Sequence, residues 1–347
     1  MSQLKISGVS KHFGSASARP AVSNVSIEVP KGTTTAVVGE SGSGKTTLLR
    51  MVAGLEIPDS GEIHIGDALS STPERVVAPE RRGVGLVFQD GALFPHLTIA
   101  KNIAYGMRRT PRKQRADRVE RMLQLVGLEG YGKRYPREVS GGEAQRIALA
   151  RALAPNPEIL LLDEPFSNLD TSLRKRLRDD VRGILCGTGT TCLFVTHDTE
   201  DALTIADEIA VMRQGELLQV GEPAALYRNP CDAYCANLFG PANRLPEAFM
   251  KGIKAPPAPG QMGDGWLWTR PEELEVLQAS GSDTIEVEVT EVRFVGERQE
   301  LKARYRAPDS QAKPDTDPDA APAGQLTLYW RGRDDIRPGQ RLWIKPN

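Results

Sequence analysis

The chain has 347 residues, of which 39% are hydrophobic and 26% charged, a composition typical of a globular protein of about two domains. Its formal net charge of -1 gives no overall basic field, so we expect no nucleic-acid partner. The sequence has no apolar run near the roughly 18 residues that span a membrane, and no apolar segment follows the N-terminal MSQLKIS. We therefore expect a cytosolic protein that neither spans a membrane nor is secreted.

Strands dominate the N-terminal part of the chain. We expect an edge strand that begins at Ile6 and Val9, and a half-buried strand in which Val25, Ile27 and Val29 alternate with polar residues. Further strands are expected at 34–38, 62–65 and 84–88, the last of them ending at Gln89.

The segment Gly39–Thr46 reads GESGSGKT and fits the phosphate-binding loop pattern G-x-x-x-x-G-K-[ST]. Its glycines let successive backbone N–H groups point at one anion, Lys45 can reach the β and γ phosphates, and the Thr46 hydroxyl can hold Mg²⁺. The apolar run before the loop and a helix after it, ended by Gly54, favour a nucleotide site over an ordinary glycine-rich turn. The residues expected to bind the nucleotide here are Gly39, Glu40, Ser41, Gly42, Ser43, Gly44, Lys45, Thr46 and Thr47.

From residue 91 to about residue 155 the pattern indicates a helical subdomain. Thr98 can cap a helix that runs through Tyr105. The basic residues between 108 and 121 indicate a solvated helix face rather than a nucleic-acid site. A buried helix face is expected from Val119, Met122, Leu123 and Val126, which follow the i, i+3, i+4, i+7 spacing.

A second helix start with a phosphate-binding composition follows at Ser140–Arg146, which reads SGGEAQR. The Ser140 hydroxyl and the amides of Gly141 and Gly142 would face an anion at the N-terminus of a helix that runs to Leu153. One chain thus carries two phosphate-facing helix starts but one lysine and one carboxylate pair. A dimer in which each ATP lies between the phosphate loop of one chain and the Ser-Gly-Gly start of the other explains this, although spacing alone supports it weakly.

Two buried strands deliver polar residues to their carboxyl ends, where ligands bind in open parallel sheets. The apolar run Ile159–Leu162 leads into Asp163 and Glu164, and the run Thr190–Thr196 ends at His197. We expect Asp163 to bind Mg²⁺ opposite the phosphate loop and Glu164 to be the general base, with His197 at the γ phosphate. A buried helix stripe is expected at Leu173, Leu177, Val181 and Ile184, and further strands at 208–212 and 216–220.

The composition changes near Pro241. Residues 242–265 are rich in Pro, Gly and Ala, and period-two alternation follows, which predicts a small antiparallel β domain. Within it the segment 307–323, APDSQAKPDTDPDAAPA, is interpreted as a disordered hairpin insertion. The expected strands lie at 285–289, 301–305, 326–330 and 342–344. The sequence therefore predicts an α/β phosphate-loop domain at 1–240 and a β domain at 241–347.

The cysteines of such a chain are expected to be reduced thiols. Cys231 and Cys235 are four residues apart and would share one face of a helix. Two ligands without a nearby His or a further Cys make a weak metal site. The other two cysteines are Cys186 and Cys192.

Over essentially its whole length the chain resembles the ATP-binding cassette family, the ATPase subunits of ABC transporters. The resemblance rests on GESGSGKT, Gln89, VSGGEAQR, LLLDEP, the run Ser167–Asp170 and His197, in the family's order. It implies that Gln89 contacts Mg²⁺ and water, that Ser140, Gly141 and Gly142 bind the partner's ATP, that Asp170 bridges the dimer, and that Phe13 stacks on adenine. Val139 and the pair Glu143-Ala144 depart from the common signature without removing a phosphate donor.

The β domain, with Arg270-Pro271-Glu272, resembles the OB-like regulatory module of bacterial import ATPases, and the stretch 91–107, GALFPHLTIAKNIAYGM, is similar to ferric-iron subunits. The resemblance implies a homodimer peripheral to the cytoplasmic face of the inner membrane. Its partners would be permease subunits, which the stretch 91–107 should contact, and a periplasmic or extracellular solute-binding protein. The alternatives are polyamine, sulfate or sugar import, an exporter subunit, a soluble cassette ATPase without a transport role, and a non-hydrolysing binding module.

Overall fold

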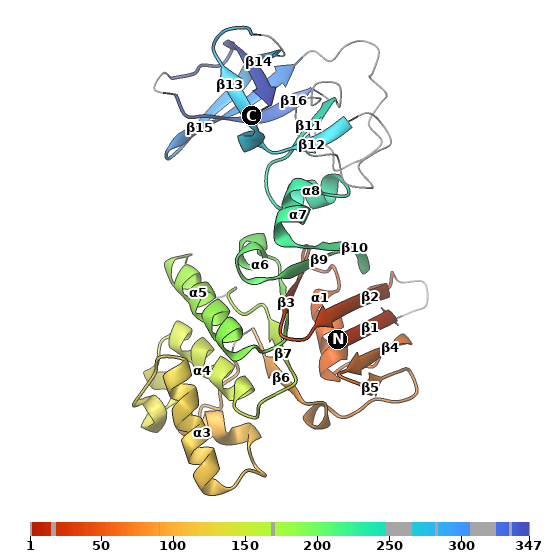
Figure 1. Ribbon diagram of the computed structural model, residues 1–347, viewed down its shortest axis with the longest axis vertical. Helices are drawn as coiled ribbons and strands as arrows, with labels where there is room; N and C mark the ends of the chain where they lie inside the picture. Colours follow the sequence, from red (N-terminus) through yellow and green to blue (C-terminus); the bar gives the residue numbers. More distant parts are fainter. Residues whose placement is uncertain are drawn as a thin grey trace. The chain divides into compact units, whose positions relative to one another are not determined.

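The computed structural model describes residues 2–14, 19–89, 91–167, 171–246, 266–281, 284–305, 324–332 and 335–346. It divides into two compact units, Met1–Pro223 and Ala224–Asn347 (Figure 1). In the described part of the chain, no helix is both long enough and apolar enough to cross a membrane.

A six-stranded sheet forms the centre of the first unit, in the order β10-β9-β3-β8-β7-β6. The strands from β9 to β6 pair in parallel and β10 pairs antiparallel to β9, so the carboxyl ends of β3, β7 and β8 lie at one edge of the sheet. Every residue of these three strands is buried, because helices cover a parallel sheet on both faces. The strands are β3 (Thr34–Val38), β6 (Val84–Val87), β7 (Ile159–Asp163), β8 (Cys192–Thr196), β9 (Glu208–Arg213) and β10 (Glu216–Gly221).

The second sheet of this unit has four antiparallel strands in the order β2-β1-β4-β5. The expectation that the first strand lies at an edge is wrong, because β1 pairs with β2 on one side and with β4 on the other. The alternation of Val25, Ile27 and Val29 with exposed residues is confirmed. The strands are β1 (Ser2–Lys11), β2 (Val22–Pro30), β4 (Ser60–Ile65) and β5 (Ala68–Ser71).

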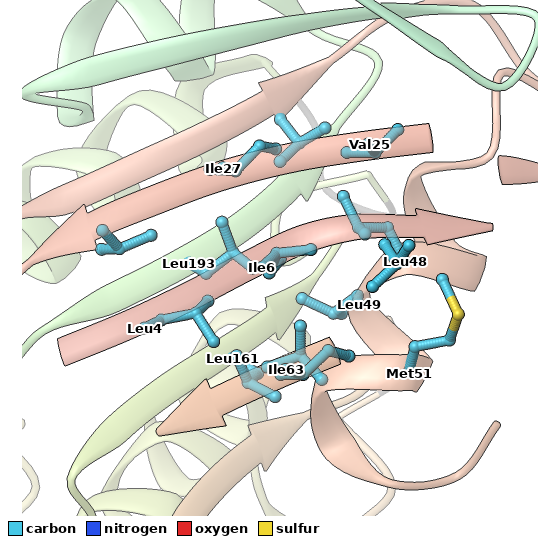
Figure 2. Packing of buried hydrophobic residues seen from close by; sticks show 14 of the residues in the cluster. Leu4, Ile6, Val25, Ile27, Leu48, Leu49, Met51, Ile63, Leu161 and Leu193 are labelled. Atoms are coloured by element: carbon cyan, nitrogen blue, oxygen red, sulfur yellow. The ribbon is translucent and has the colours of Figure 1, made fainter. Parts of the chain in front are cut away.

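Helix α1 (Lys45–Ala53) packs into an apolar cluster between the two sheets. Figure 2 shows Leu4 and Ile6 of β1 beside Leu48 and Leu49 of α1. The cluster also includes Leu161 of β7 and Leu193 of β8, so both sheets and the helix share one core (Figure 2). Full burial of each such side chain contributes about 1.5–3 kcal/mol, which fixes the helix that follows the phosphate-binding loop.

The remaining helices of the first unit confirm most of the expected buried faces. Thr98 caps α2 by accepting a hydrogen bond from the Lys101 amide, and Leu173 is only half-buried although Leu177, Val181 and Ile184 are buried. The side chains of Val119, Met122, Leu123 and Val126 are buried as expected. The helices are α2 (Ile99–Ile103), α3 (Arg112–Leu125), α4 (Gly141–Leu153), α5 (Thr171–Thr188) and α6 (Thr199–Ile205), with single turns at Pro79–Arg81, Ala104–Gly106, Tyr131–Lys133 and Pro136–Glu138.

The second unit contains a five-stranded antiparallel sheet in the order β13-β17-β14-β15-β16 and a two-stranded ribbon of β11 and β12. An antiparallel β region is therefore confirmed, while the segment 307–323 lies outside the described residues. The elements are α7 (Pro223–Arg228), α8 (Ala233–Leu238), β11 (Asn243–Pro246), β12 (Trp266–Thr269), a turn at Pro271–Glu273, β13 (Leu274–Leu277), β14 (Ile285–Val295), β15 (Arg298–Tyr305), β16 (Gln325–Trp330) and β17 (Arg341–Pro346).

The two helices at the start of this unit lie before the boundary expected near residue 240. They group with the β elements because the buried guanidinium of Arg270 donates hydrogen bonds to backbone carbonyls on this segment. Its Nε donates to Tyr227 at 2.9 Å, and its Nη1 donates to Ala236 at 2.8 Å and to Gly240 at 3.0 Å.

Candidate active site

The phosphate-binding loop runs from the end of β3 to the start of α1, and two of its glycines are required by close approach. Gly39 has φ 155° and Gly44 has φ 100°, both in the region that favours glycine. A Cβ at Gly39 would lie 2.1 Å from the carbonyl oxygen of Met212, and a Cβ at Gly44 would lie 2.1 Å from that of Ala21. The loop therefore presents its backbone in a form that no other residue at these positions allows.

Lys45 lies inside this loop with 5% of its surface exposed. Its Nζ donates hydrogen bonds to the carbonyl oxygens of Gly39 at 2.8 Å and Glu40 at 2.9 Å, and to Ser43 Oγ at 3.3 Å. Burial lowers the pKa of Lys45, and the nearby carboxylates of Glu164, Asp163 and Glu40 oppose that shift. Backbone carbonyls thus hold the ammonium group at the centre of the loop, where an anion would meet it.

Thr46 and Asp163 meet across the gap between α1 and β7. The Thr46 hydroxyl donates a hydrogen bond of 3.2 Å to Asp163 Oδ1, although the two residues are 117 positions apart in the sequence. Burial raises the pKa of Asp163, which is 8% exposed. The structure thus brings together the two residues expected to share Mg²⁺, and Thr47, next on α1, is half-buried.

Glu164 occupies the first turn after β7 in an unusual backbone conformation. Its φ is 44°, and its amide donates a hydrogen bond of 3.0 Å to the carbonyl oxygen of Val195 on β8. The left-handed region costs a non-glycine residue about 1–3 kcal/mol, and residues held there cluster at functional sites. Glu164 Oε2 lies 3.0 Å from Nδ1 of His197, which follows β8. Adjacent parallel strands therefore deliver the expected base and the expected histidine to one point.

Gln89 follows β6 and connects to the same turn through Ser167. Gln89 Nε2 donates a hydrogen bond of 3.1 Å to Ser167 Oγ, and Ser167 Oγ donates one of 3.1 Å to the carbonyl oxygen of Glu164. Ser167 belongs to a run that carries the family resemblance, but sequence reasoning gave it no role. The structure gives it the position of a bridge between Gln89 and the Glu164 turn.

Arg174 of α5 is a residue that sequence reasoning missed. Its Nη1 lies 2.5 Å from Oδ2 of Asp198, and its Nη2 donates a hydrogen bond of 3.4 Å to the carbonyl oxygen of Ser167. Asp198 in turn caps α6 by accepting a hydrogen bond of 2.9 Å from the Glu200 amide. Arg174 thus ties the turn after β7 to the turn after β8, and no motif in the sequence marks it.

The second helix start is built as a capping box. The Ser140 Oγ accepts from the Glu143 amide at 3.4 Å, and the Ser140 amide donates to Glu143 Oε2 at 2.7 Å. These hydrogen bonds from Ser140 lower the pKa of Glu143, which also accepts one of 2.9 Å from the Tyr131 hydroxyl. Gly141 is exposed, whereas a Cβ at Gly142 would lie 2.9 Å from the Leu173 side chain. The amides of this start are thereby fixed in place on α4.

Two further expected residues lie at the periphery. Phe13 is 50% exposed, and the Nζ of Lys11 lies 5.5 Å from the centroid of its ring. That lysine is held by Asp59 at 3.1 Å, which fixes the segment before Phe13. Asp170 lies outside the described residues.

The comparisons with known proteins agree with this geometry. Residues 22–167 match the family model for ABC transporters. The chain is 45% identical over 291 residues to the Fe(3+) ions import ATP-binding protein FbpC of Pseudomonas fluorescens, an alignment that covers 81% of this chain and 80% of that protein. It is 43% identical over 354 residues to the sulfate/thiosulfate import ATP-binding protein CysA of Synechococcus elongatus, covering 99% of this chain and 94% of that protein.

Solved structures give the same family. A dimeric structure of the ATP-binding cassette MJ0796, in a post-hydrolysis state bound to ADP and Pi, matches with a TM-score of 0.56 and 28% identity, covering 63% of this chain and 98% of that chain. The expected α/β phosphate-loop fold is thus confirmed. From its identity to these relatives over most of both sequences, the chain belongs to the ABC transporter family, among the import ATP-binding proteins, and is an ATPase coupled to transport.

Proposed function

We propose that ATP binds along Gly39–Thr47 and that Mg²⁺ is held by Thr46, Asp163 and Gln89. The residues fit this ion, because a hydroxyl, a carboxylate and an amide supply the hard oxygen donors that Mg²⁺ prefers, and two of them already meet at 3.2 Å. Bound Mg²⁺ neutralises charge that develops on the transferred phosphoryl group. Lys45 adds a second positive charge from within the loop.

In this proposal Glu164 is the general base and His197 positions it. The observation that carries the ATPase mechanism is the 3.0 Å contact between Glu164 Oε2 and His197 Nδ1, at the carboxyl ends of two adjacent parallel strands. A carboxylate at this point can accept a proton from the attacking water, and the histidine fixes its orientation. Gln89, linked to the Glu164 turn through Ser167, contacts that water and the metal.

The same proposal places a second chain over the nucleotide. Ser140, Gly141 and Gly142 of one chain would bind the ATP held by the loop of the other, and Asp170 would bridge the two chains. The capping box supports this, because it leaves a rigid helix N-terminus whose dipole favours phosphate. Phe13 would stack on adenine from an exposed position. ATP then closes the dimer and hydrolysis releases it, which drives the transporter between two states.

The membrane partners would dock on the helical part of the first unit. A cavity of about 1080 Å³ opens there between α2 and α3, and its floor includes Leu97, Ala100 and Tyr105 of the stretch 91–107. Its rim carries the basic side chains of Lys101, Arg108, Arg112, Arg115 and Lys133 and the acidic one of Glu120. An apolar floor with a mostly basic rim suits a helix of a permease subunit that carries acidic residues. Such docking would hold this chain peripherally at the cytoplasmic face of the membrane.

The proposed solute is ferric iron. The similarity of the stretch 91–107 to ferric-iron subunits supports it, as does the 45% identity to a ferric-iron relative. Sulfate is the second candidate, because the sulfate/thiosulfate relative is 43% identical over 99% of this chain.

The test is ATPase activity in proteoliposomes that contain this chain with its permease subunits. A solute-binding protein loaded with ferric iron, and in parallel one loaded with sulfate, would be added from the outside. Stimulation of phosphate release by the ferric protein alone is the expected result. Stimulation by the sulfate protein alone would keep the ATPase mechanism and overturn iron as the solute. If neither protein stimulated an otherwise active ATPase, the importer role itself would be contradicted.

A further inference from the structure

Three donor groups converge at the start of α8 in the second unit, far along the chain from the nucleotide site. Cys231 is exposed, Asp232 is half-buried and Cys235 is fully buried. Their ligand atoms all lie within 4.8 Å of one another, and the two Sγ atoms are 3.5 Å apart. Cys231 precedes the helix, which begins at Ala233, so the two cysteines do not share a helix face as the sequence spacing suggested. The third donor, Asp232, is an aspartate between the two cysteines that sequence reasoning did not count.

The spacing of the donors matches a tetrahedral metal site. With Zn–S bonds of about 2.3 Å and tetrahedral angles, two thiolate sulfurs lie about 3.8 Å apart, and a carboxylate oxygen binds Zn²⁺ at about 2.0–2.2 Å. The observed Sγ–Sγ separation of 3.5 Å is close to that edge. A disulfide, in contrast, needs about 2.05 Å and has no use for the carboxylate. The arrangement of Cys231, Asp232 and Cys235 therefore suits an ion better than a covalent bond.

The carboxylate is held in place by the helix. Asp232 caps α8 by accepting a hydrogen bond of 2.7 Å from the Cys235 amide to its Oδ1. One carboxylate oxygen is thus oriented by the backbone, which fixes the direction of the other. An outer hydrogen bond of this kind orients metal-binding side chains in known sites. The cap and the ligand set therefore reinforce each other.

We propose that Cys231, Asp232 and Cys235 form a zinc site with a solvent molecule in the fourth position. Two thiolates select a thiophilic ion, and the carboxylate favours Zn²⁺ over Cu(I). The exposed Cys231 leaves a path for entry of the ion. Carbonyls at and beyond the other end of α8, those of Ala236 and Gly240, bind the guanidinium of Arg270. A zinc ion at the start would thus fix the segment at both ends within the second unit.

The experiment uses the full chain, reduced with a phosphine and free of nucleotide and Mg²⁺. Co²⁺ is added first, because two thiolate ligands give a thiolate-to-cobalt charge-transfer absorption, and Zn²⁺ is then titrated to displace it. We expect one equivalent of Co²⁺ with this absorption and its replacement by one equivalent of Zn²⁺. Cys231→Ser should abolish the band. Asp232→Asn should weaken Zn²⁺ binding by more than the roughly 10- to 100-fold that loss of an outer-shell partner costs.

The variants separate loss of a ligand from loss of the fold. Asn is as good a helix cap as Asp, so Asp232→Asn keeps the hydrogen bond to the Cys235 amide while removing the anionic ligand. Circular dichroism should show the same helix content in this variant and in the unchanged protein. Cys186→Ser, at an exposed cysteine on α5, is the matched control and should bind the metals normally. No charge-transfer band in the unchanged protein, or Zn²⁺ binding of equal strength in Asp232→Asn, would overturn the proposal, as would formation of a disulfide that competes with the metal under reducing conditions.

Discussion

Glu164 carries two features that a structural glutamate rarely combines, a left-handed backbone and a side-chain contact to His197 at 3.0 Å. If it is the general base, Glu164→Gln should lower kcat by about 10²–10⁴-fold, since an amide cannot accept the proton of the attacking water. ATP binding should remain, because Lys45 and the loop amides are unchanged. Phosphate release and nucleotide affinity measured on the same preparation check both statements.

The control for this change is Glu288→Gln, the same substitution at an exposed glutamate of β14 in the other unit. It should turn over ATP like the unchanged protein. If Glu164→Gln did so as well, Glu164 would not be the base.

Which residues of the site could be predicted depended on how local the signal is. Lys45 and Thr46 belong to one contiguous motif, and Asp163 and Glu164 end an apolar strand, so their chemistry is visible within a few positions. Arg174 could not be found in this way, because its role comes from contacts to two separate turns, at Ser167 and Asp198, that only the fold brings together.

Helix α4 shows how one element can serve stability and function at once. Ser140 caps the helix, so Ser140→Ala should cost about 0.5–2 kcal/mol of stability whatever its other role. If Ser140 also contacts the partner's nucleotide, the same change should abolish hydrolysis while each chain still binds ATP. Urea denaturation, ATP binding and phosphate release measured together check this.

Glu143→Ala separates the two effects. It removes the reciprocal half of the capping box but keeps the Ser140 hydroxyl and the glycine amides. We expect a comparable loss of stability with hydrolysis retained. Equal loss of hydrolysis in both variants would assign the effect to the cap alone.

Helix α1 depends on a buried arginine at its other end. Arg82, which is 4% exposed, donates hydrogen bonds to the carbonyl oxygens of Met51 at 3.0 Å and Val52 at 2.8 Å, and to Ser71 Oγ at 2.5 Å. Arg82→Met should destabilise the first unit by about 1–3 kcal/mol for each carbonyl left without a donor. Urea denaturation should detect it, while Arg81→Met at the exposed neighbour should change stability little. Similar midpoints for the two variants would show that Arg82 does not support the helix.

Element positions were less predictable than element types. The strand pattern at β1 is clear in the sequence, yet its place between β2 and β4 depends on pairing with residues more than fifty positions away. Leu173 fits the apolar stripe of α5 but is only half-buried. Periodicity identifies a face, whereas the neighbour that covers it is a property of the fold.

At the scale of the whole molecule, the proposed closed state needs two chains. With Glu164→Gln, ATP should convert the protein into a dimer that persists, because the nucleotide that bridges the chains is not hydrolysed. Light scattering should show a mass of twice the single chain with ATP and Mg²⁺ and a smaller mass with ADP. The double variant Glu164→Gln with Ser140→Ala should lose the dimer, and a dimer of undiminished strength there would contradict the assignment of Ser140 to the partner's nucleotide.

The boundary between the units makes a last prediction. The sequence places it near residue 240, where composition changes, whereas the structure groups the chain from Ala224 onward with the β elements. Arg270 is 2% exposed, and its hydrogen bonds to Tyr227 and Ala236 join the two helices to that unit. A fragment 224–347 should therefore unfold cooperatively. A fragment 242–347 should be less stable by about 3 kcal/mol or more, since a hydrogen bond to a charged group contributes about 1.5–3 kcal/mol.

Urea denaturation of the two fragments, followed by tryptophan fluorescence, decides between the boundaries. Arg270→Met in the longer fragment is the internal check, because it removes the same hydrogen bonds without shortening the chain and should lose a similar amount of stability. If the shorter fragment were as stable as the longer one, the two helices would be a connection rather than a part of the unit. The boundary would then lie where the change in composition places it.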